Sequence, residues 1–150
     1  MIVKTKLFGD IDVPPESVIV FPQGLVGLPS LQKFVLIQEE GLEPFFTLQS
    51  VDDPEFALWI APAVFIDQSY APPVDEAEIE DLGNKDDILP MVIVWTEEDE
   101  GGNIHTYANF KAPLLINPTL RRGRQVIIDR EEYLLKRDIT AVMNGASADT

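Results

Sequence analysis

Short apolar segments, separated by Gly, Pro, Asp and Asn, recur along the whole chain. Most of them are rich in β-branched and aromatic residues, which favour strands over helices, and this spacing is typical of an all-β domain. We predict strands at residues 33–38, 45–51, 56–61, 91–96, 104–111, 114–117 and 125–129, and a further strand that ends at Pro22.

Neighbouring strands in this pattern are joined by turn-forming residues. Residues 39–43, with Gly41 among them, form a turn between the first two strands, and residues 97–103 (EEDEGGN) form another between strands 91–96 and 104–111. We expect each pair to form a hairpin. In the second hairpin, alternate residues from Ile104 to Phe110 share one face. Residues 118–124 (PTLRRGR) connect strands 114–117 and 125–129 in the same way.

Two segments are predicted to be short helices. Residues 75–82 (DEAEIEDL) follow a pair of prolines, begin with acidic side chains that favour a helix amino terminus, and stop at Gly83. Residues 131–136 are a weaker second candidate. From Asn144 the chain is small and polar, so we predict a single domain over residues 1–143 and a disordered tail over residues 144–150.

The charge of the chain limits what it binds. Its 26 acidic and 11 basic side chains give a net charge of −15, which repels phosphate backbones and anionic lipids. We therefore expect no direct binding to nucleic acid or to a membrane. The charge either keeps the protein soluble or attracts a basic partner, and both interpretations stay open. The basic cluster at Arg121, Arg122 and Arg124 either binds an anionic surface or pairs with nearby acids, and we expect the second.

Residues able to carry out catalysis are scarce. The chain contains no cysteine and one histidine, His105, which excludes thiolate nucleophiles and makes a zinc site improbable. We expect His105 to be solvent-facing or hydrogen-bonded rather than catalytic, and the GLVG stretch at residues 24–27 lacks the lysine of a phosphate-binding loop. The sequence thus predicts a binding protein with no enzymatic activity, no cofactor, no metal and no small-molecule substrate. No secretory signal is visible, so a cytoplasmic location is expected.

Several ordered blocks of the sequence resemble the FliW family of flagellar assembly factors. The resemblance spans residues 9–133, and it is specific because the blocks agree in order as well as in residues. Phe110 stands where a leucine is expected and Leu28 where a phenylalanine is common, but both keep apolar character. The blocks with the clearest markers are FPQGLVGLP at residues 21–29, LQSVDDP at residues 48–54, and NFKAPLLIN at residues 109–117, followed by Gly123 and Gln125.

This resemblance implies a small antiparallel β-barrel-like domain that has two protein partners and acts in the cytoplasm of flagellated bacteria. One partner is flagellin, bound near its carboxy-terminal helical region. The other is CsrA, a small basic RNA-binding dimer that represses flagellin translation. When flagellin is scarce, a free FliW-like protein binds and antagonises CsrA. When flagellin accumulates, it captures the FliW-like protein and repression returns, so flagellin level is coupled to flagellin translation by partner exchange.

In that picture, the acidic segments steer the domain to CsrA and place a negative field beside its RNA path. For any single acidic residue, the alternative is that its charge only keeps the exposed side of a helix in contact with water. The acidic residues concerned are Asp75, Glu76, Glu78, Glu80 and Asp81, together with residues 97–100.

Two further segments carry candidate binding residues. We hypothesise that Phe21, Leu25 and Leu28 form an apolar groove or rim for an amphipathic partner helix, with the alternative that they plug one end of the barrel. Asn109 and Lys111 are expected to face outward, before Pro113 breaks the strand. They either contact a partner or define a sheet corner.

Two other function classes stay open. A small β-type hydrolase using carboxylates or a bound cation would show a pocket with two converging carboxylates, whereas a binding protein would show an apolar surface groove. A chaperone or anti-sigma-like module that binds some other protein is distinguished only by its partner.

Overall fold

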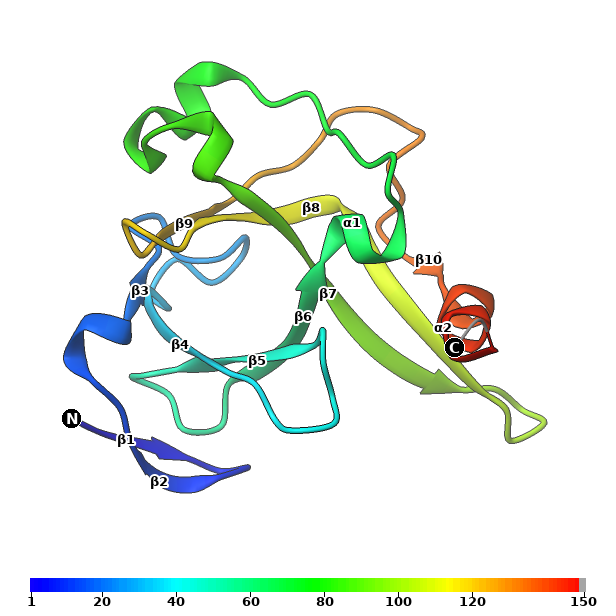
Figure 1. The fold of residues 1–150 in the computed structure, drawn as a ribbon, viewed down its shortest axis with the longest axis horizontal. Helices are drawn as coiled ribbons and strands as arrows, with labels where there is room; N and C mark the ends of the chain where they lie inside the picture. Colours follow the sequence, from blue (N-terminus) through cyan, green and yellow to red (C-terminus); the bar gives the residue numbers. More distant parts are fainter. Residues whose placement is uncertain (149–150) are drawn as a thin grey trace.

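The structure is a computed structural model that describes residues 1–148, and most of its regular elements are strands, as predicted (Figure 1). The strands are β1 (Ile2–Thr5), β2 (Gly9–Asp12), β3 (Ile19–Val20), β4 (Lys33–Ile37), β5 (Phe46–Ser50), β6 (Ala57–Pro62), β7 (Leu89–Glu98), β8 (Ile104–Asn117), β9 (Arg122–Gln125) and β10 (Arg137–Asp138). The helices are α1 (Ala63–Ile66), α2 (Thr140–Ala148) and the 3-10 helices η1 (Pro15–Ser17), η2 (Glu76–Leu82) and η3 (Lys85–Asp87).

The main sheet closes on itself through β9. Its strand order is β10-β8-β7-β6-β5-β4-β3-β9, and β9 also pairs with the carboxyl half of β8. Strands β3 to β9 therefore form a ring in the ribbon, while β10 and the β1–β2 hairpin lie outside it (Figure 1). All pairings are antiparallel except that of β3 with β9, which is parallel through Val20 and Arg122. The predicted antiparallel barrel is thus correct apart from this one pairing.

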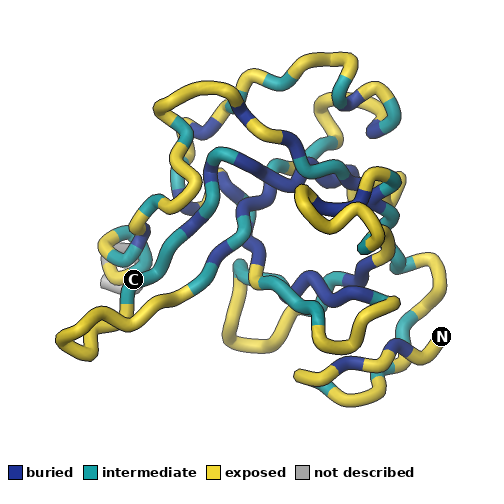
Figure 2. The backbone as a smooth tube through the Cα atoms, turned by 180° about the vertical axis from the view of Figure 1, so that it is seen from behind, coloured by how far each residue is buried: buried dark blue, intermediate teal, exposed yellow. Residues whose placement is uncertain are grey.

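The inside of the ring is filled by large apolar side chains. Successive strands contribute Phe34, Leu48 and Ile60, and Phe21 meets Phe34 edge to face with ring centroids 5.4 Å apart. Two smaller clusters cover the outside of the sheet, one beneath α1 and Tyr70 and one beneath η2. Buried backbone follows the strands and exposed backbone follows the connections (Figure 2). The barrel is therefore a packed scaffold, with exposed connecting segments around it.

The two predicted hairpins, β4 with β5 and β7 with β8, are confirmed. The prediction that Pro113 ends its strand is wrong, since β8 continues to Asn117. Met91 pairs with Leu114 and Ile93 with Asn109, so residues 110–113 oppose Val92 alone. A proline that cannot donate a backbone hydrogen bond is tolerated in such a bulge.

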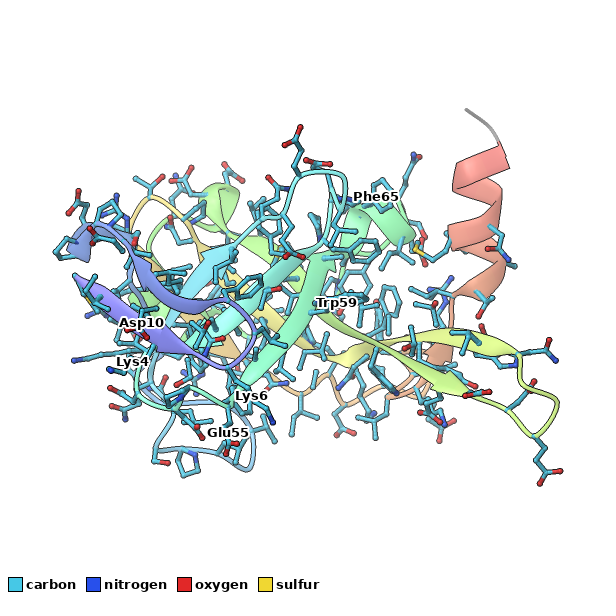
Figure 3. The ribbon with its side chains drawn as sticks, turned by 90° about the horizontal axis from the view of Figure 1, so that it is seen from below. Lys4, Lys6, Asp10, Glu55, Trp59 and Phe65 are labelled. Carbon is cyan, nitrogen blue, oxygen red and sulfur yellow. The ribbon has the colours of Figure 1, made fainter. Side chains whose placement is uncertain are left out.

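Three other expectations need correction. The strand expected at residues 125–129 is instead β9 (Arg122–Gln125), because Gly123 allows the chain to pack against the barrel core. No helix forms at residues 131–136, since the carbonyl of Leu134 accepts a hydrogen bond from the Phe110 amide and the segment runs beside β8. The amino-terminal β1–β2 hairpin was not predicted. It docks on the barrel where the Lys6 amide bonds the Pro54 carbonyl, with the Lys6 side chain beside Glu55 (Figure 3).

The predicted short acidic helix is present as η2, with 3-10 rather than α geometry, and it stops at Gly83 as expected. The predicted disordered tail overlaps α2, which runs to Ala148, and its last two residues lie outside the described part of the chain. The disordered tail over residues 144–150, and the domain bounds of residues 1–143 that depend on it, therefore stay a prediction.

Candidate protein-interaction surfaces

The first candidate surface is an acidic ridge formed by η2, η3 and their caps. The Asp75 carboxylate accepts a hydrogen bond from the Ala77 amide and begins η2, while the Asn84 side chain does the same for η3. Ile79 and Leu82 face inward and are buried, so the charged side chains of η2 are left on the outer side. The exposed acids of the ridge are Asp75, Glu76, Glu80, Asp86 and Asp87.

The ridge is fixed to the barrel by side chains of β8 and β9. Asn117, which is 1% exposed, donates a hydrogen bond of 2.8 Å from Nδ2 to the Leu82 carbonyl. Arg124 donates to the Glu78 carbonyl at 3.0 Å, and Arg122 lies 3.9 Å from the carboxylate of Asp81. Arg122 therefore pairs with an acid, as expected, whereas Arg124 bonds a backbone carbonyl and not a carboxylate. Both contacts hold the ridge against the barrel.

An apolar groove of about 680 Å³ runs beside this ridge. Its walls come from the segment that leads into η2, from η2 and η3 themselves, and from the outer side of the barrel at Pro90 and Leu115. Its only carboxylate is Asp75, which already caps η2, and its only amine is Lys85. Within residues 1–148 no cluster of three or more His, Cys, Asp or Glu could hold a metal ion. Such a groove suits apolar side chains of a partner. Its other lining residues are Tyr70, Ala71, Pro72, Pro73, Val74, Ile79 and Ile88.

The second acidic surface is the tip of the β7–β8 hairpin, which projects away from the barrel (Figures 1 and 3). Glu97 accepts hydrogen bonds from Trp95 Nε1 at 2.8 Å and from Lys136 Nζ at 2.9 Å. These bonds, with that of Trp95 the stronger cause, lower the pKa of Glu97. All four acids of residues 97–100 are exposed, but Glu97 and Asp99 are already hydrogen-bonded within the chain, so Glu98 and Glu100 are the two most available to a partner.

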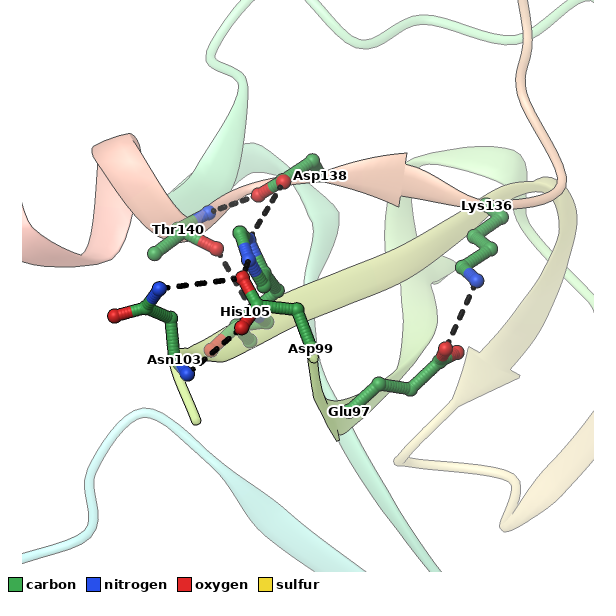
Figure 4. Close-up of polar contacts among 8 residues, drawn as sticks. Glu97, Asp99, Asn103, His105, Lys136, Asp138 and Thr140 are labelled. Atoms are coloured by element: carbon green, nitrogen blue, oxygen red, sulfur yellow. Dashed lines mark hydrogen bonds and ion pairs between the residues drawn. The ribbon is translucent and has the colours of Figure 1, made fainter. Parts of the chain in front are cut away.

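His105 lies between two carboxylates at the base of this tip (Figure 4). Its Nε2 is 2.8 Å from Asp99 Oδ2, and its Nδ1 is 3.3 Å from Asp138 Oδ2 on β10. The Asp99 hydrogen bond is the main reason that the pKa of His105 is raised, and the same bond helps to lower the pKa of Asp99 to about 2. The expected hydrogen-bonded histidine is confirmed, and it ties the hairpin to the segment that leads into α2.

The structure separates the three apolar candidates Phe21, Leu25 and Leu28. Phe21 is fully buried and Leu25 is 4% exposed, and both belong to the barrel core. Leu28 is 42% exposed on the turn, where the Leu25 and Leu28 amides and carbonyls bond each other. The burial of Phe21 and Leu25 favours the alternative that they plug the barrel, while Leu28 is open to a partner.

Asn109 and Lys111 both stabilise the bulge in β8. The Asn109 Oδ1 accepts hydrogen bonds from the amides of Lys111 and Ala112. Lys111 Nζ donates to the carbonyl of Ile128 at 3.1 Å. These bonds favour the sheet-corner interpretation for both residues. They also hold the segment after β9 against β8.

Sequence reasoning did not find the groove, because its walls come from residues far apart in the chain. Leu115 lies on β8, whereas Val74 and Ile88 flank the two acidic helices. The proline pair at residues 72–73, directly before an acidic helix, was the available local signal, since it indicates a rigid segment beside that helix.

Comparison with known proteins identifies relatives over nearly the whole chain. The model of the family described as "FliW protein" matches residues 2–139. The chain is 31% identical over 152 residues to the flagellar assembly factor FliW of Thermoanaerobacter pseudethanolicus, covering 97% of each protein. It is 37% identical over 135 residues to that of an Azoarcus species, covering 87% of this chain and 92% of the relative. A crystal structure of the flagellar assembly factor FliW superposes with a TM-score of 0.80 at 30% identity, covering 93% of this chain and 96% of the other.

Among the described residues, the helices are too short or too polar for any of them to cross a bilayer.

Proposed function

The chain belongs to the FliW family of flagellar assembly factors, and on that premise we propose that it works by exchanging two protein partners, flagellin and CsrA. Free of flagellin, it binds CsrA and antagonises translational repression. Bound to flagellin, it releases CsrA. The proposal places this exchange in the cytoplasm and involves no catalytic step.

The acidic ridge is the observation that carries the proposal. It presents five exposed carboxylates on a rigid element beside an apolar groove, in a chain with a net charge of −15. A field of this kind raises the association rate with a basic partner and repels competing phosphate groups. The exposed Glu98 and Glu100 at the hairpin tip extend the negative surface. CsrA is basic and binds RNA, so both effects favour displacement of RNA.

The groove supports a protein partner over the hydrolase alternative. A carboxylate-dependent hydrolase needs two carboxyl groups that converge on one substrate. Here the single carboxylate in the groove is already bonded to the backbone of η2. The exposed Leu28 stays the proposed apolar contact for a helical segment of flagellin.

Binary titration calorimetry tests this proposal. The protein is titrated separately into purified CsrA and purified flagellin from the same organism. The proposal expects saturable binding to each, and it expects the CsrA isotherm to weaken steeply as salt rises, because exposed charges are screened. Absence of binding to both partners contradicts the proposal and favours a module for some other protein. Binding to flagellin alone contradicts the CsrA half of it.

A further inference from the structure

A separate exposed aromatic surface lies on the outer face of β6, away from the acidic ridge. Trp59 is 44% exposed and stacks beside Phe45, with ring centroids 6.2 Å apart. Two residues further along the same face of β6, Ala61 is fully buried under the cluster that includes α1. The outer face of β6 is therefore covered by other side chains at Ala61 and exposed to solvent at Trp59.

The apolar surface continues at the carboxyl end of this strand, because the pairing of Phe46 with Ile60 brings the start of β5 beside the end of β6. Leu42 is exposed in the turn before Phe45, and the Phe45 amide bonds the Leu42 carbonyl. At this same end β6 leads directly into α1, where Phe65 is 47% exposed (Figure 3). We call this set the β6 patch. Its members are the exposed Leu42, Trp59, Val64 and Phe65, together with the partly buried Phe45.

Acidic side chains border the patch on one side. The turn that connects β4 to β5 carries Glu39, Glu40 and Glu43, all exposed and within six residues of Phe45. Glu43 accepts a hydrogen bond from the Gly41 amide, which helps to hold the turn in shape. Aromatic faces and carboxylates both attract ammonium and guanidinium groups, the former through cation–π contacts.

From this arrangement we propose that the β6 patch is a docking surface for a partner segment that is amphipathic and basic, with apolar side chains on Trp59 and Phe45 and lysine or arginine beside Glu39 and Glu40. An exposed tryptophan within an apolar patch is typical of residues that dominate binding energy. An exposed apolar face with one charged border suits a helix that carries apolar side chains on one side.

Charge complementarity selects this occupant over a second copy of the chain. A twofold pairing of identical patches would bring two glutamate-rich turns to one interface, in chains that each carry a net charge of −15. Like charges placed together oppose association. The glutamates are instead complementary to a basic segment.

The inference rests on the proposed function in taking the partner to be a protein, so its test uses synthetic peptides and does not depend on flagellin or CsrA. An 18-residue amphipathic helix of leucine and lysine is titrated into the ¹⁵N-labelled protein, and the same helix with glutamate in place of lysine is the control. The two tryptophans give two indole NMR signals, which Trp95→Phe assigns. Trp95 lies at the acidic hairpin tip and reports non-specific attraction to acids.

The expected result is a saturable shift of the Trp59 signal with the lysine peptide, little shift of Trp95, and no shift with the glutamate peptide. Trp59→Ser and the double variant E39K/E40K should each weaken binding at least about tenfold. E76K/E80K changes the net charge equally on the acidic ridge and should change affinity less than about twofold. Equal shifts of both indoles, equal weakening by the two charge variants, or no saturable shift would overturn the inference.

Discussion

The ring of Phe21 occupies the space where a side chain at residue 123 would begin. A Cβ atom added to Gly123 would lie 2.6 Å from Phe21 Cε1 and 2.8 Å from Cε2. Gly123 belongs to β9, the strand that joins β3 to β8, and Phe21 directly follows β3. The closure of the barrel therefore depends on the absence of a side chain at this one position.

Replacing Gly123 by alanine should destabilise the protein by about 1–3 kcal/mol, because the fully buried ring has no free space into which to move. The free energy of unfolding from urea denaturation measures this. Gly101→Ala is the matched control. It lies in the exposed hairpin turn, where an added Cβ would meet its nearest atom, Nδ2 of Asn103, at 3.2 Å. Equal stability of the two variants would contradict the packing argument.

Asn117 anchors the acidic ridge, so its replacement by alanine should loosen η2 as well as lower stability. The change removes the donor to the Leu82 carbonyl and the acceptor for the amides of Thr119 and Leu120. Leaving buried polar groups without partners costs about 1–3 kcal/mol. Hydrogen exchange of the η2 amides should accelerate. In Asn84→Ala, which removes only the exposed cap of η3, the exchange of η2 should stay close to that of the unchanged protein.

The His105 bridge makes part of the stability depend on pH. Because the pKa of His105 is raised in the folded protein, its contribution is complete below the unfolded value of about 6.5 and is lost as pH rises through the folded pKa. The lowered pKa of Asp99 works in the opposite direction, and its contribution is lost as pH falls toward about 2. The bridge should thus stabilise most between about pH 4 and 6.5.

The melting temperature of His105→Gln, measured against the unchanged protein across pH, tests this expectation. The difference between the two proteins should be largest near about pH 5 and should shrink by about pH 8. NMR titration of the ring protons gives the pKa of His105 directly. A His105 pKa at or below the ordinary value, or a difference in melting temperature that does not change with pH, would show that the bridge makes no pH-dependent contribution to stability.

Charge reversal on the ridge should slow the association with CsrA. Glu76 and Glu80 are exposed, and the variant E76K/E80K leaves the Glu78 carbonyl free to anchor Arg124. We expect an association rate lower by about tenfold at low salt and a flatter salt dependence, measured by stopped flow. The control D10K/E16K makes the same change in net charge in and shortly after β2, and the β1–β2 hairpin lies at the bottom of Figure 1 whereas the η2 segment lies at the top. If both variants slow association equally, net charge and not the ridge is responsible.

Local patterns account for what could be predicted of the fold. The β4–β5 and β7–β8 hairpins join segments a few residues apart, so turn residues and apolar runs were enough to find them. Closure through β9 depends on the contact of Phe21 with Gly123 across about a hundred residues, which no local pattern reports. The leucine-rich segment at 131–136 has helical propensity, but its backbone pairs with β8 instead.

The candidate surfaces were predictable to a smaller extent. The acidic helix was found from composition and caps, which are local. Leu25 and Leu28 are both apolar residues of one glycine-rich turn, yet only the structure shows that one is buried and the other exposed. Trp59 looks like an ordinary core residue in the run FALWIA, and its exposure follows from where α1 and Tyr70 end on the sheet.

The proposed exchange of flagellin and CsrA on this protein is tested by a competition titration. The protein is titrated into CsrA by calorimetry, first alone and then after saturation with flagellin. We expect the free protein to bind CsrA and flagellin to abolish or strongly weaken this binding. Binding to CsrA with unchanged affinity in the presence of saturating flagellin would contradict it.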